Sequence, residues 1–117
     1  MVTHSALKDH PIGDLRTNRL KCVKYLSKLK RLLKDNGRNQ REIKAMIEEI
    51  DIEDMRQSIS STDSERRGLL ANKSSCTKSK AYLCVNETRL IIEINKLMAQ
   101  IERIDAAIEY RKTQGEI

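Results

Sequence analysis

Aromatic side chains are almost absent from this sequence, which has no Phe, no Trp and three Tyr among its 117 residues. A core must therefore be built from Leu, Ile, Val, Met and Ala. That set favours helix-on-helix packing over β-sheets, which draw on aromatic and β-branched residues. The single Pro and the four Gly leave few positions that would break a helix. We therefore expect an all-α fold with the length of a single domain.

Long apolar runs are also absent, and no stretch of about 18 residues has the composition of a membrane-spanning helix. The chain does not open with the charged and then apolar pattern of a secretory signal. Its three Cys show no CxxC spacing, which argues against a disulfide framework and favours a reducing compartment. We expect an intracellular protein, cytoplasmic or nuclear, with no membrane partner.

Candidate catalytic groups are scarce. The two histidines, His4 and His10, lie in a segment with no apolar period, so no rigid scaffold is predicted around them. No glycine-rich phosphate loop, GxSxG or HExxH motif occurs. The acidic residues near position 50 are interpreted as the solvated face of a helix. We therefore expect no enzymatic activity, no cofactor and no metal site.

Two helices are predicted in the first half of the chain. Asp14 is suited to cap a helix over 15–35, in which apolar residues recur at helical spacing until the stop signal Asp35-Asn36-Gly37. Asn39 and Glu42 form a capping-box pattern that opens a second helix over about 40–60. Because the loop between them is so short, the two helices are predicted to form an antiparallel hairpin.

A long C-terminal helix is predicted over about 87–112. Its apolar stripe repeats every three or four residues, which is typical of bundles and coiled coils, and we assign it to oligomerisation. The stripe consists of Leu90, Ile94, Leu97, Ile101, Ile104 and Ile108. Thr62 and Glu65 form another capping box, but residues 66–86 have no clear period. The predicted organisation is a mobile arm at 1–13, a single helical domain at 14–113 and a tail at 114–117, forming a helical bundle completed by dimerisation.

Charge is strongly segregated along the chain. Residues 16–41 contain ten Lys and Arg against one acid, whereas residues 42–65 contain eight acids against two basic residues. On a helical wheel, most of the first group lies opposite the apolar stripe. An ordinary solvated helix instead mixes both signs, because oppositely charged pairs one turn apart stabilise it. The candidate binding residues are Arg16, Lys21, Lys24, Lys28, Arg31, Lys34, Arg38 and Arg41.

This surface predicts a polyanionic partner. The scarcity of aromatics argues against single strands, which usually stack on aromatic rings, and favours a duplex of RNA or DNA bound through its phosphates without sequence preference. The alternative is a coiled-coil scaffold or protein interaction module, in which the C-terminal stripe drives self-association and the charge blocks select the partner. A purely structural explanation is also open. In it, the acidic segment neutralises part of the basic residues across the hairpin, and the others are simply solvated.

Overall fold

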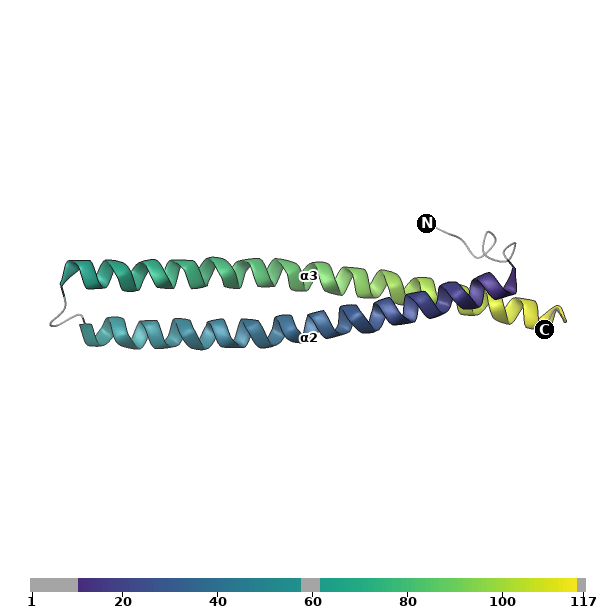
Figure 1. The fold of residues 1–117 in the computed structure, drawn as a ribbon, viewed down its shortest axis with the longest axis horizontal. Coiled ribbons are helices and arrows are strands. Elements are labelled where there is room, and N and C mark those ends of the chain that lie inside the picture. Colours follow the sequence, from purple (N-terminus) through teal and green to yellow (C-terminus); the bar gives the residue numbers. More distant parts are fainter. Residues whose placement is uncertain (1–10, 58–61, 116–117) are drawn as a thin grey trace. The chain divides into compact units, whose positions relative to one another are not determined.

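The computed structural model describes residues 11–57 and 62–115, which form two α-helices (Figure 1). Helix α2 covers Ile12–Gln57 and helix α3 covers Asp63–Thr113. The described residues contain no β-strand. The all-α prediction is therefore confirmed, while the number and the bounds of the helices differ from those predicted.

The predicted break at Asp35-Asn36-Gly37 is wrong, because α2 continues through it. The predicted segment 15–35 and residues 40–57 of the predicted segment 40–60 are consecutive parts of one helix, so they cannot form the predicted hairpin, and the expected cap at Asn39 lies inside the helix. Residues 58–60 of the second segment lie outside the described residues. The side-chain amide of Asn36 is buried and donates a hydrogen bond of 2.9 Å to the carbonyl oxygen of Leu83 in α3. This tertiary contact competes successfully with the local turn preference of the residue.

We expect Gly37→Ala to stabilise the protein by about 0.5–1 kcal/mol, because glycine costs that much in a helix interior. The backbone at Gly37 has an ordinary negative φ, and an added Cβ would meet only the Arg41 guanidinium at 3.7 Å. Urea denaturation followed by circular dichroism measures the change. Gly115→Ala is the contrast, since Gly115 has a φ of 75° and should tolerate alanine poorly. A loss of stability in Gly37→Ala would mean that the helix ends there.

The helix ends show one confirmed prediction and one that is wrong. The predicted cap at Thr62 is confirmed, because the backbone N–H of Glu65 donates to the Thr62 hydroxyl at 3.3 Å. The helix that it opens is α3, which thus begins well before the predicted start near residue 87. Helix α2 begins earlier than expected, because the carbonyl of Pro11 accepts from the N–H groups of Asp14 at 3.0 Å and Leu15 at 3.1 Å. Asp14 therefore lies in the first turn, where its charge still complements the helix dipole. Of the predicted arm, residues 1–10 lie outside the described residues.

Residues 66–86, which the periodicity left unassigned, belong to α3. In this stretch, polar side chains share the half-buried stripe with apolar ones, and this mixture conceals the helical period. The stripe at spacings of three and four consists of Leu69, Lys73, Cys76, Lys80, Leu83 and Glu87.

The contacts divide the described residues into two compact units, each made of one segment of α2 and one of α3. Unit 1 comprises 11–32 and 90–115. Its core packs Leu15 of α2 against Ile104, Ala107 and Ile108 of α3, and Cys22 lies at the edge of this cluster. The predicted apolar stripes of the two segments thus meet inside unit 1.

Unit 2 comprises 33–57 and 62–89 and has a far more polar interior. Among its described residues, only Asn36 is buried. The amide of Gln40 donates to the side-chain oxygens of Asn36 and Glu87, and the Cys84 thiol donates to Gln40 at 3.5 Å. Polar groups rather than a sealed apolar core therefore hold this end of the unit together.

Two ion pairs continue the contacts across unit 2. Lys73 lies 2.5 Å from Asp51, and Arg66 lies 3.6 Å from Asp54. The hydrogen bond and the charge of Asp51 raise the pKa of Lys73 above its ordinary value. Because rising residue numbers in one segment pair with falling numbers in the other, the two segments of unit 2 run antiparallel.

Candidate nucleic-acid interface

Five of the eight predicted binding residues belong to unit 1, and all five side chains are exposed. At about 100° per residue, four of them lie within an arc of about 80° on the side of α2 opposite its buried leucines. Their spacing of three, four and three residues follows the helix surface in a single row. We call the five residues the basic face: Arg16, Lys21, Lys24, Lys28 and Arg31.

Within the part of the chain that the structure describes, no carboxylate forms a salt bridge with a residue of the basic face. Arg19, which flanks the apolar stripe, behaves differently and forms a bidentate pair with Asp105 of α3. The hydrogen bond and the charge of Asp105 raise the pKa of Arg19 above its ordinary value. The ion pair between the two helix segments thus neutralises Arg19 at the flank of the apolar stripe. The cations of the basic face, on the opposite side of α2, form no such pair among the described residues.

The positive charge is concentrated in unit 1. Its described residues contain eleven Lys and Arg against five Asp and Glu, a net charge of +6. The described residues of unit 2 contain eleven Lys and Arg against ten acids, a net charge of +1. The positive electrostatic potential is therefore expected to be stronger around unit 1 than around unit 2.

The remaining three predicted residues, Lys34, Arg38 and Arg41, belong to unit 2. All three are exposed, and Arg38 lies 3.5 Å from the carboxylate of Asp35 on the same helix. The structure thus gathers five of the eight residues on one unit and assigns three to the other.

The stripe assigned to oligomerisation lies in unit 1, where much of it is already covered. Ile94, Ile104 and Ile108 are buried within the unit, and Leu97 and Ile101 are half-buried. Packing against α2 accounts for the apolar period at the three buried positions without a second chain. A role of the stripe in self-association stays a prediction, and such a contact would have to use its half-buried members.

Sequence reasoning missed the polar contacts of unit 2, although the sequence holds a signal for them. The stripe that runs through Leu29 and Leu33 continues at Asn36, Gln40 and Ile43 with the same alternation of three and four residues. Polar residues at single positions of such a stripe are known to specify register at a cost in stability. If the stripe is followed by its spacing of three and four residues, and polar residues are accepted at single positions, the sequence predicts the continuous helix.

Neither a metal-ligand group nor a membrane-spanning helix is found in the described part of the chain. No group of three or more His, Cys, Asp or Glu side chains there is arranged to hold a metal ion. The two histidines lie outside the described residues. Neither helix contains, within its described length, an apolar stretch that would cross a bilayer.

No family model, curated protein or solved structure matches this chain. No activity can therefore be transferred from a relative.

Proposed function

We propose that this protein is a non-catalytic nucleic-acid-binding protein that contacts the phosphate backbone of a duplex, RNA or DNA, through the basic face of unit 1. The observation that carries the proposal is the row of exposed cations with no carboxylate partner among the described residues. Phosphate contacts of this kind give affinity without sequence preference.

The dimensions of the basic face suit a duplex. From Arg16 to Arg31 the helix rises about 22 Å, at about 1.5 Å per residue. Over that length a DNA duplex carries about 13 phosphates, since it has one charge per about 1.7 Å of axis. The four cations of the row and Arg16 beside it are therefore matched by enough phosphates over the same length of duplex.

Binding would also relieve a cost within the helix. Like charges one turn apart, such as Lys24 and Lys28, destabilise a helix by a few tenths of a kcal/mol per pair. A bound polyanion would screen this repulsion, whereas the repulsion persists when no polyanion is bound. Only Tyr25 offers an exposed aromatic ring on the α2 segment of unit 1, within the described residues. That composition favours a duplex over stacked single strands.

A salt titration tests the proposal. Gel-shift assays with duplex RNA, duplex DNA and the matching single strands should show duplex binding that weakens steeply as salt rises. If all five residues of the basic face contact phosphates, the slope of log K against log salt should be about −4 to −5 for DNA, at about 0.9 per contact. Absence of any shift at about 50 mM salt would rule out this function, since non-specific contacts are strongest at low salt.

A further inference from the structure

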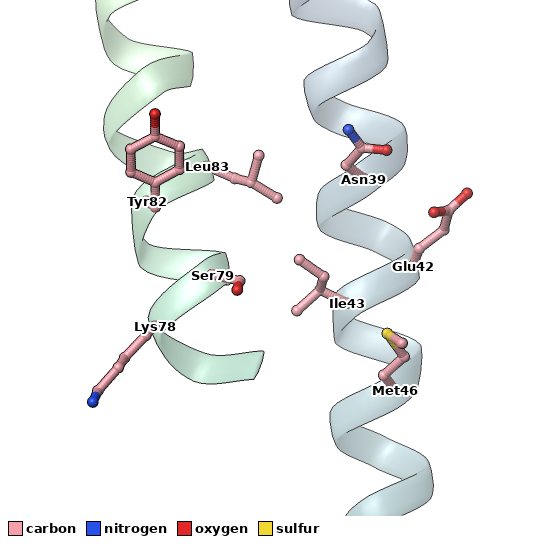
Figure 2. A pocket seen from close by; sticks show the side chains of 8 residues that line it. All are labelled: Asn39, Glu42, Ile43, Met46, Lys78, Ser79, Tyr82 and Leu83. Atoms are coloured by element: carbon pink, nitrogen blue, oxygen red, sulfur yellow. The ribbon is translucent and has the colours of Figure 1, made fainter. Parts of the chain in front are cut away.

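Unit 2 carries two adjoining grooves between its segments of α2 and α3. Their volumes are about 530 and 540 Å³, and Met46 lines both of them. Figure 2 shows the first groove, with Ile43 and Leu83 pointing toward each other across it. The shared methionine makes the two grooves one continuous surface along unit 2.

The side chains of this surface are too exposed for a finished core. Met46 and Tyr82 line the first groove, yet they are 51% and 67% exposed. No apolar side chain among the described residues of unit 2 is buried, in contrast to unit 1. A pair of helices that buries no apolar side chain gains little free energy to offset the entropy of ordering it. A further layer over the groove would therefore stabilise the unit.

We propose that the missing layer is a second copy of this chain, whose unit 2 covers the groove face to face about a two-fold axis. Such packing forms a four-helix arrangement in which the groove of each copy buries the Met46 and Tyr82 of the other. A two-fold contact closes on itself and limits the assembly to a dimer. The interface differs from the stripe of unit 1 that the sequence assigned to oligomerisation.

The charges flanking the groove select how the two copies align. Glu42 lies on the α2 side and Lys78 on the α3 side, and Figure 2 shows them pointing outward on opposite sides of the groove. Neither forms a salt bridge with another described residue. If α2 of one copy lies over α3 of the other, Glu42 meets Lys78 of the partner subunit.

The opposite alignment is unfavourable. If α2 lay over α2 with Met46 at the two-fold axis, Glu42 would meet Glu49 of the partner subunit, and like charges across an interface oppose association. On the α3 side the grooves are lined by the small side chains of Ser75 and Ser79, which let a neighbouring helix approach closely. Charge and shape therefore favour the same arrangement, α2 over α3.

Sedimentation equilibrium of the full chain tests the dimer. We expect the wild type to dimerise and Met46→Glu to raise the dissociation constant at least about tenfold, since it places a charge in the apolar groove. Ile52→Glu is the matched control, because Ile52 lies on the same helix, is 54% exposed and lines neither groove. A monomeric wild type, or equal weakening by both variants, would overturn the proposal.

A charge exchange tests the alignment. Glu42→Lys and Lys78→Glu should each weaken the dimer, and the double variant should restore it. With α2 over α2, Glu42→Lys would face Glu49 of the partner subunit and strengthen the dimer, which would overturn the proposed alignment. Reversal of charge at Lys24, Lys28 and Arg31 should leave the dimer intact, so this inference and the nucleic-acid proposal fail or hold independently.

Discussion

Combined substitution of Lys24→Glu, Lys28→Glu and Arg31→Glu is expected to reduce duplex affinity at least about 100-fold at low salt, because three phosphate contacts become three repulsions. All three side chains are exposed and form no salt bridge with another described residue. The free energy of unfolding should therefore change by no more than about 0.5 kcal/mol per substitution. Gel-shift titration measures the affinity and thermal unfolding measures the stability.

The matched control changes the net charge by the same amount elsewhere. Lys44, Arg67 and Lys96 are exposed and form no salt bridge within the described residues. Their combined replacement by Glu should weaken binding far less, since these residues lie outside the basic face. If both triple variants lost affinity equally, net charge rather than the basic face would govern binding. A collapse of stability in the first variant would instead assign its cations a structural role.

The largest effect on stability is expected from Ile104→Ala, with a loss of about 2–5 kcal/mol. Ile104 is 1% exposed and packs in unit 1 with Leu15, Ala107 and Ile108. Its truncation removes apolar contact and leaves a cavity that the two helix segments refill only in part. Urea denaturation followed by circular dichroism, in the Met46→Glu background and at a concentration where sedimentation shows a monomer, measures the loss without a contribution from the proposed dimer.

Ile92→Ala provides the comparison for this prediction. Ile92 lies on the same helix and in the same unit but is 47% exposed, so truncation should cost well under 1 kcal/mol. A small effect of Ile104→Ala in the monomeric background would contradict an internal role for the residue. The apolar stripe of α3 would then act between chains, as the sequence alone had suggested.

The C-terminal part of α3 was predictable because its stripe is purely apolar. From Leu90 to Ile108 every position of the repeat is Leu or Ile, so the period is visible without knowledge of the partner. The Thr62 cap was also predictable, because it requires only a hydroxyl and the free N–H groups of the first turn. Signals of both kinds are local, and at these two places no tertiary contact overrides them.

The continuity of α2 was not predictable in the same way. Asn36 and Gly37 prefer turns in isolation, and the residues near them supply a plausible cap for a new helix. The helix persists where the Asn36 amide finds the Leu83 carbonyl at 2.9 Å. Since that acceptor lies 47 residues away in sequence, no local pattern reveals it.

The basic face illustrates the same division. The sequence by itself determined that the chain is helical and that a row of cations lies opposite the leucines of α2. Both follow from residue order, because periodicity and charge can be read from it directly. Only the tertiary structure decided which cations remain available, since Arg19 is neutralised by Asp105 whereas Lys24 and Lys28 have no carboxylate within reach among the described residues. It also decided that Ile104 is buried inside unit 1 and that Met46 is left uncovered in unit 2. Burial and ion pairing depend on which helix segments face each other, and that arrangement is set by contacts between residues distant in the sequence.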